Sequence, residues 1–127
     1  MPVVDYAAMP EFSMRAGITG KWIASHEHGA TTTSVLSNTV EPGVAARSHT
    51  HEFEEIVLVE AGRLWVEFGG TRVFAVPGQC VIIPPRTPHA WGAEGPVAAR
   101  VLFIWPVLEP FAPGKSTYLE GAPPKVS

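Results

Sequence analysis

Residues 43–62 read G-V-A-A-R-S-H-T-H-E-F-E-E-I-V-L-V-E-A-G and contain two histidines, His49 and His51, separated by a single residue. Side chains two positions apart share one face of a β-strand, with their Cα atoms roughly 6.6 Å apart, so both imidazoles can reach one metal ion. On a helix the two side chains would point about 200° apart. The spacing therefore predicts a strand that carries two candidate metal ligands.

Glu55 follows His51 by four residues and leaves two alternatives. A straight strand would place it roughly 13 Å away, too far to share an ion. Either Glu55 is unrelated to the histidines, or the chain turns a corner at residues 52–54 and brings the carboxylate back. We favour the corner, because a further histidine with a rigid approach occurs later in the chain.

That further histidine is His89, which ends the proline-rich turn P-P-R-T-P-H at residues 84–89. Three imidazoles and one carboxylate form a mixed nitrogen and oxygen donor set suited to Fe(II), Mn(II), Ni(II), Co(II), Cu(II) or Zn(II). We therefore expect one divalent transition metal ion here. The alternative is that the histidines are ordinary surface or core residues, which holds for most lone histidines but is disfavoured for this combination.

The stretch resembles the first motif of the cupin superfamily, G-x5-H-x-H-x3-E-x6-G, at every specified position. These positions are Gly43, His49, His51, Glu55 and Gly62.

The second cupin motif, G-x5-P-x-G-x2-H-x3-N, is matched in part. Gly78, Pro84 and His89 fit it, whereas Arg86 and Ala93 stand where glycine and asparagine are usual. Together the two motifs span about half of the chain. The resemblance implies a small jelly-roll β-barrel with a metal ion inside it. The ligands that it implies are His49, His51, Glu55 and His89.

Composition bounds the class of protein. The 127 residues suit one domain, and 46% of them are hydrophobic while only 17% are charged. A net charge of −3 without a basic cluster gives no support for nucleic-acid binding. No segment resembles a signal peptide or a membrane span. The single cysteine, Cys80, excludes an internal disulfide and favours a reducing cytoplasm.

Short β-rich segments separated by glycine and proline turns predict an all-β barrel or sandwich of about nine strands. We expect a single domain over residues 1–127, with a core at about 18–105, an extended N-terminal arm at 1–17 and a proline-rich tail at 106–127 that contains no regular strand. The expected strands cover residues 21–25, 31–40, 55–60, 63–68, 71–76, 80–83 and 97–105. The segments 63–68 and 71–76 form a hairpin about Gly69-Gly70. We expect Cys80 to be a core residue and the strand at 97–105 to be buried on both faces.

Alternation along the strands assigns further side chains to a face. If His49 points inward, Arg47 does too, and if Glu55 points inward, Ile56 and Leu58 point outward. Large aliphatic side chains on an outer face usually mark an interface, so we expect a homo-oligomer, most simply a homodimer.

Three residues are candidates for the wall of a binding cavity. Arg47 would pair with a substrate carboxylate, Trp91 shares the parity of His89 and would pack on an apolar or ring portion, and Arg86 would lie at the cavity mouth. The alternative is that Arg47 lies in solvent at the rim and Trp91 is ordinary core. A second H-x-H pair, His26 and His28, has no flanking β-formers, so we assign it to a surface loop in preference to a second metal site.

Three classes of function agree with this pattern. The favoured class is a metal-dependent enzyme, since similar cupins include dioxygenases, isomerases, decarboxylases and lyases that act on small oxygenated or carboxylated molecules. The second is a non-catalytic sensor or ligand-binding protein, and the third is a barrel with a purely structural metal, which a chelator would unfold. A metal-free sugar epimerase is disfavoured by the complete ligand set.

Overall fold

The computed structural model describes all 127 residues and confirms the all-β fold. It contains eleven strands and two short 3₁₀ helices, neither of which has the length or apolar character needed to cross a membrane. In chain order the elements are η1 (Tyr6–Ala8), β1 (Phe12–Arg15), β2 (Ile18–Ala24), η2 (His26–His28), β3 (Ser34–Val40), β4 (Ala45–His51), β5 (Glu55–Ala61), β6 (Leu64–Phe68), β7 (Thr71–Ala75), β8 (Cys80–Ile83), β9 (His89–Ala93), β10 (Ala99–Trp105) and β11 (Ser116–Tyr118).

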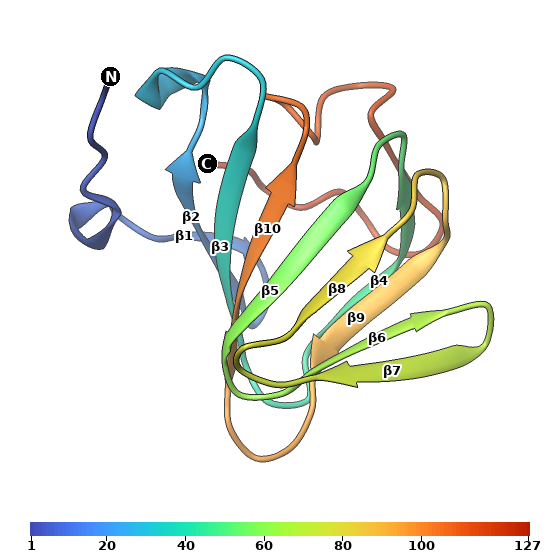
Figure 1. Ribbon diagram of the computed structural model, residues 1–127. Coiled ribbons are helices and arrows are strands. Elements are labelled where there is room, and N and C mark those ends of the chain that lie inside the picture. Colours follow the sequence, from blue (N-terminus) through green and yellow to red (C-terminus); the bar gives the residue numbers. More distant parts are fainter.

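The strands form two antiparallel sheets that face each other as a jelly-roll barrel (Figure 1). The six-stranded sheet has the order β1-β2-β3-β10-β5-β8, and the five-stranded sheet has the order β11-β4-β9-β6-β7. Strand residues alternate between buried and partly exposed positions, which places one face of each sheet against the other. The core between the sheets includes Leu36, Val57, Leu64, Val66, Val101 and Phe103.

The predicted hairpin is confirmed. β6 and β7 pair from Leu64 opposite Ala75 to Phe68 opposite Thr71. Gly69 and Gly70 form the turn with φ angles of 60° and 76°. Both angles lie in the left-handed region that glycine adopts without a Cβ clash, which explains the Gly-Gly pair.

Two expectations about burial are wrong. Cys80 is exposed, because β8 is the edge strand of its sheet and Cys80 lies on the outer face opposite Leu58. β10 is buried on one face only: Phe103 and Trp105 are in the core, while Leu102 and Ile104 are half-buried on the outer face. A central strand of a two-layer fold still has an outer face, and an unbroken run of apolar residues does not show which of them lie on it.

A β-bulge in β4 overturns the predicted inward orientation of Arg47. Ala46 pairs with Trp91 and His49 pairs with His89, so two residues of β4, Arg47 and Ser48, lie opposite one residue of β9. The extra residue reverses the alternation, and Ala46 is buried while Arg47 is exposed. Arg47 therefore points away from the barrel interior.

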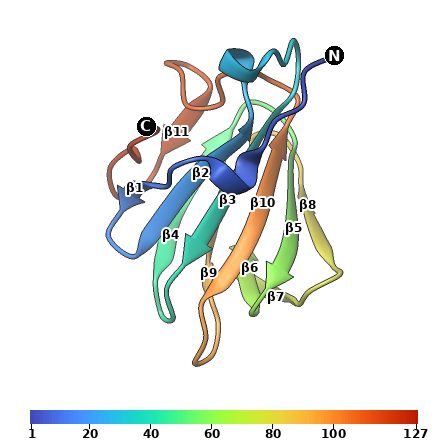
Figure 2. The same cartoon turned by 90° about the vertical axis from the view of Figure 1, so that its left-hand side faces the viewer.

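Both chain ends contribute strands, β1 from the segment expected to be an arm and β11 from the proline-rich tail. β11 contradicts the expectation that the tail contains no regular strand, since Ser116, Thr117 and Tyr118 pair with His51, Thr50 and His49. In Figure 2, β1 and β11 lie at the same side of the barrel as edge strands of opposite sheets.

The last residues of the tail continue along the same side of the barrel. Lys125 donates its backbone N–H to the carbonyl of Met14 at 2.9 Å, and the indole of Trp22 donates to the carbonyl of Val126 at 2.8 Å. The C-terminal tail thus wraps the domain and packs against its N-terminal strands.

Candidate metal centre

Two sheets together position the four candidate ligands. His49 and His51 project from the inner face of β4, and His89, the first residue of β9, pairs with His49. Glu55 is the first residue of β5 in the opposite sheet. The chain bends at residues 52–53 between β4 and β5, so the predicted corner is present and returns Glu55 to His51.

The side-chain donor atoms converge in a buried cluster. One nitrogen from each of His49, His51 and His89 lies within 4.8 Å of the others. The Glu55 carboxylate lies between two of the rings, with Oε1 3.2 Å from Nε2 of His51 and Oε2 3.3 Å from Nε2 of His89. All four residues are at most 7% exposed.

Hydrogen bonds at Nδ1 orient all three imidazoles. Nδ1 of His49 donates to the carbonyl of Arg47 at 2.7 Å, and Nδ1 of His89 donates to the carbonyl of Thr87 at 2.8 Å. Nδ1 of His51 lies 2.7 Å from the hydroxyl of Ser116, which itself donates to the carbonyl of Pro110. Because the Ser116 hydroxyl already donates its only proton to Pro110, it accepts a hydrogen bond from His51. Each ring is therefore protonated at Nδ1 and leaves Nε2 free, and histidines in this tautomer can bind a metal through Nε2.

Burial and charge shift the pKa values within the cluster. Burial lowers the pKa of His49 to about 4, with a further contribution from the charge of His89. Burial opposes the ionised form of Glu55, but hydrogen bonds and charges from His51 and His89 outweigh it and hold the pKa of Glu55 well below its usual range. Burial likewise opposes the charge on His89, yet its contact with Glu55 raises the pKa of His89. The cluster contains an ionised carboxylate and favours a positive charge beside it.

The arrangement fits a bound cation. Oε2 of Glu55 and Nε2 of His89 are buried without a hydrogen-bond partner. Electron-pair donors 3.2–3.3 Å apart repel each other unless a proton or a metal ion lies between them. Three imidazoles and one carboxylate are donors that Fe, Mn, Ni, Co, Cu and Zn ions all accept.

Comparison with known families agrees with this geometry. A sequence family described as "Cupin domain" matches residues 38–105, which is more than half of the chain. The chain belongs to the cupin family. Comparison with curated protein sequences finds no match.

Solved structures similar to this cupin confirm the fold. The polyketide cyclase RemF from Streptomyces resistomycificus superposes with a TM-score of 0.79 at 18% identity, covering 96% of this chain and 87% of RemF. KdgF from a Halomonas species gives 0.72 at 20% identity, covering 84% and 94%. A variant of oxalate decarboxylase from Bacillus subtilis gives 0.74 at 17% identity, covering 94% of this chain but 32% of the decarboxylase. At these identities the similarity concerns the fold alone.

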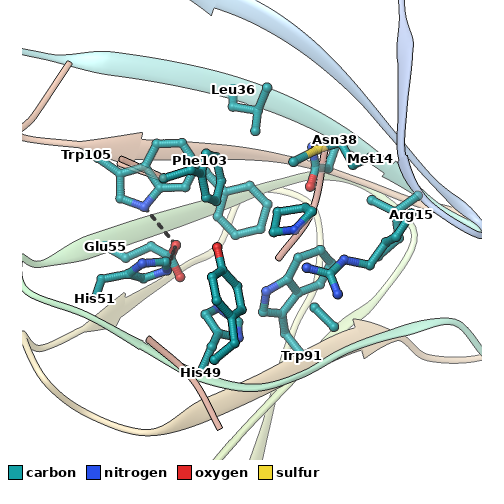
Figure 3. Close-up of a pocket in the computed structure, with 15 residues that line it drawn as sticks. Met14, Arg15, Leu36, Asn38, His49, His51, Glu55, Trp91, Phe103 and Trp105 are labelled. Carbon is teal, nitrogen blue, oxygen red and sulfur yellow. Dashed lines mark hydrogen bonds and ion pairs between the residues drawn. The ribbon is translucent and has the colours of Figure 1, made fainter. Parts of the chain in front are cut away.

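Beside the donor cluster the barrel of this cupin contains a cavity of about 30 Å³, and Figure 3 shows the side chains that line it. Trp91 lines the cavity, as predicted. Arg47 does not line it, because the bulge turns its side chain outward. Arg86 is exposed and faces Glu52, with 3.6 Å between Nη1 and the carboxylate. It does not line the cavity, so the expectation that it lies at the cavity mouth is wrong.

Several cavity residues were missed by the sequence reasoning. They come mostly from the aromatic residues of β10 and from the two chain ends, and include Arg15, Asn38, Phe103, Trp105, Phe111 and Tyr118. Trp105 contacts the candidate ligands directly, since its indole N–H donates to Oε1 of Glu55 at 2.8 Å. The alternation along residues 99–105 identifies Phe103 and Trp105 as inward-facing, but Arg15 and Tyr118 carry no local signal.

His26 and His28 lie in η2 at the surface, away from the donor cluster. His26 is exposed and pairs with Glu109 at 3.3 Å, and Nδ1 of His28 lies 3.2 Å from the hydroxyl of Ser25. The assignment of this H-x-H pair to a surface segment is confirmed.

Proposed function

We propose that this cupin is a metal-dependent enzyme that acts on a small oxygenated or carboxylated molecule. The metal would be one divalent transition ion held by His49, His51, Glu55 and His89. The observation that carries the proposal is the set of three oriented Nε2 atoms and one ionised carboxylate that converge beside a cavity. The reaction class we favour is that of a dioxygenase, isomerase, decarboxylase or lyase.

The chain's own residues define what such a site offers a substrate. Hydrogen bonds donated by Nδ1 hold the three imidazoles in place, and the indole N–H of Trp105 donates to Glu55. Indole and phenyl rings from Trp91, Phe103 and Phe111 form an apolar wall that would keep water away from a small ligand. When bound, a divalent ion supplies Lewis-acid chemistry and orients oxygen atoms of a chelating ligand.

A non-catalytic sensor or ligand-binding role is the second candidate. It uses the same cavity and the same donors but predicts saturable binding without turnover. A purely structural metal is the third, and it predicts that a chelator unfolds the protein. The open cavity beside the donors supports the first two roles over the third.

The first experiment is the metal content of protein purified without a histidine tag, compared with the His49→Ala/His51→Ala double variant. We expect about one transition metal ion per chain in the wild type and its loss in the variant, with the β-sheet circular dichroism spectrum retained. Turnover is then measured as oxygen uptake or product formation with small diketones, catechols and carboxylates. A wild type that contains no metal and binds none of Fe(II), Mn(II), Ni(II) or Zn(II) contradicts the proposal.

We also propose that this cupin forms a homodimer through the outer face of the six-stranded sheet. Aliphatic side chains lie next to each other on that face across three strands. Ile56 has Ile104 and Ile82 as its cross-strand neighbours, and Leu58 has Leu102 and Cys80. Ile82 is 57% exposed in the isolated chain, and a second copy would cover it.

Sedimentation velocity tests the dimer. The wild type should sediment as a dimer and Ile82→Glu as a monomer. The control is Val97→Glu, because Val97 is equally exposed but lies outside this sheet face. A monomeric wild type at tens of micromolar, or equal effects of the two substitutions, contradicts the proposal.

A further inference from the structure

Arg15 is the cavity-lining residue with a permanent positive charge. It ends β1 and is half-buried, and Figure 3 shows its side chain entering the cavity from the side opposite Glu55 and His51. Its guanidinium donates from Nη1 to the carbonyl of Ala122 at 3.3 Å, and no carboxylate lies within 4.0 Å of it. A half-buried guanidinium with only a neutral partner retains unused donors and an uncompensated charge.

Tyr118 offers a second unused donor to the same cavity. Its hydroxyl is buried and makes no hydrogen bond. The hydroxyl of Ser116, two positions earlier on the same strand, donates to Pro110 and accepts from His51, and its effect on the Tyr118 phenol is smaller than that of burial. The Tyr118 ring stacks on His49, with 6.1 Å between centroids and an interplanar angle of 25°. The phenol is therefore held beside the candidate metal ligands with its O–H free.

The two residues reach the cavity from opposite ends of the chain. Arg15 belongs to the edge strand of one sheet and Tyr118 to the edge strand of the other, and these two edges lie at the same side of the barrel (Figure 2). Burial raises the pKa of the Tyr118 phenol, and the positive charge of Arg15 partly opposes that shift. Both residues lie outside the matched cupin segment at residues 38–105.

Apart from the candidate metal ligands, where Glu55 would be paired with the metal ion, the cavity wall has few free polar groups. Asn38 is polar, but its amide N–H groups already contact the sulfur of Met14 at 3.1 Å and the carbonyl of Ser37 at 3.0 Å. Aromatic side chains make up much of the rest. A charged fork and a phenol O–H within an apolar wall form a receptor for a planar anion, because a charge-assisted hydrogen bond is strongest where water is excluded.

We propose that Arg15 and Tyr118 bind the carboxylate of the substrate and thereby select small carboxylates that fit a cavity of about 30 Å³. This assignment rests on the proposed function, in which the other end of the molecule faces the metal centre. Arg15 donates two N–H groups and Tyr118 donates its O–H to the carboxylate oxygens. The cupin core supplies the metal donors, and the chain ends determine which molecule is selected.

The test measures binding of matched acid and amide probes by ligand-detected NMR and by quenching of tryptophan fluorescence. The pairs are formate with formamide and acetate with acetamide, and inorganic phosphate is included as a competing anion. Each probe is titrated into the protein as purified and into protein saturated with Zn(II). The variants are Arg15→Gln, Arg15→Lys and Tyr118→Phe. Arg47→Gln is the control, because Arg47 is exposed outside the cavity.

We expect the wild type to bind the acids about tenfold more tightly than the amides, and Arg15→Gln to lose that preference. Arg15→Lys should retain part of it, Tyr118→Phe should weaken acid binding several-fold, and Arg47→Gln should match the wild type. Equal binding of acids and amides, absence of any saturable acid binding, a preference for phosphate, or equal losses in Arg15→Gln and Arg47→Gln would overturn the assignment.

The two proposals fail separately in this design. An Arg15-dependent acid preference in protein that binds no metal supports the carboxylate site and contradicts the metal-dependent function. One metal ion per chain without an Arg15-dependent preference supports the metal centre and contradicts the carboxylate site.

Discussion

The hydroxyl of Ser116 lies 2.7 Å from Nδ1 of His51, so the C-terminal segment orients a histidine 65 residues earlier in the chain. The hydroxyl donates to the carbonyl of Pro110 at 2.7 Å and therefore accepts from the imidazole. This contact belongs to β11, which pairs with β4 alongside His51. The tail is thus part of the candidate metal centre as well as a cover for the barrel.

Ser116→Ala should weaken metal binding about tenfold, because loss of a partner at the other ring nitrogen frees the imidazole to rotate and change tautomer. Metal affinity is measured by competition with a chelating dye. Thr117→Ala is the control, since Thr117 is exposed on the same strand. Equal metal affinities of Ser116→Ala and the wild type would show that His51 is oriented without the tail.

Trp105→Phe should destabilise the metal-free protein by about 1–3 kcal/mol, because the Glu55 oxygen that accepts the indole N–H stays buried without that donor. The measurement is urea unfolding in the presence of a chelator. Trp22→Phe is a matched control: its indole donates to a backbone carbonyl near the surface, which water can replace. Similar losses in the two variants would contradict a specific role for the contact between Trp105 and Glu55.

The pairing of His49 with His51 could be predicted because local strand geometry controls it, whereas Glu55 and His89 were assigned to the same site by the resemblance to the cupin motifs. Strand alternation places His49 and His51 together, and a short corner returns Glu55. The same alternation failed at Arg47, since the bulge is a property of how β4 pairs with β9. Counting along one strand cannot detect an extra residue relative to its neighbour.

The contribution of the chain ends could not be predicted for a different reason. Arg15, Ser116 and Tyr118 lie in segments without a sustained hydrophobic period, and a single arginine or tyrosine has no spacing pattern to interpret. They reach the site through long-range pairing of β1 with β2 and of β11 with β4. The fold class therefore followed from patterns in the middle of the chain, while the cavity mouth depended on tertiary contacts.

Arg86→Gly should stabilise the protein by about 0.5–1 kcal/mol, because Arg86 has a φ of 55°, a left-handed conformation that costs a side-chain-bearing residue energy. Its backbone N–H donates to the carbonyl of His51 at 2.7 Å, so the loop keeps this strained geometry. The lost ion pair with Glu52 is exposed and contributes little.

Arg86→Ala separates the two effects. It removes the same ion pair but keeps a Cβ in the left-handed region, so it should give no gain in the free energy of unfolding. Thermal and urea unfolding of both variants provide the measurement. A stabilisation shared by Arg86→Ala and Arg86→Gly would mean that the arginine side chain, and not the backbone angle, carries the cost.

Tyr118 makes the stability of the fold sensitive to alkaline pH. Burial raises the pKa of Tyr118, and the opposing charge of Arg15 does not cancel the shift. The folded state therefore binds the phenolic proton more tightly than the unfolded state does. This contribution is fully present below the unfolded pKa of about 10 and is lost as the pH rises through the higher folded value. Above about pH 10, the wild type should lose stability relative to Tyr118→Phe.

Urea unfolding between pH 8 and pH 11 tests this relation, and the ultraviolet absorbance of tyrosinate reports the titration itself. The chain contains two tyrosines, so Tyr6→Phe is the natural control, because Tyr6 is half exposed in η1. Tyr6→Phe should keep the alkaline loss of stability, and Tyr118→Phe should remove part of it. The same slope in both variants would show that the Tyr118 phenol ionises as freely in the folded chain as in the unfolded one.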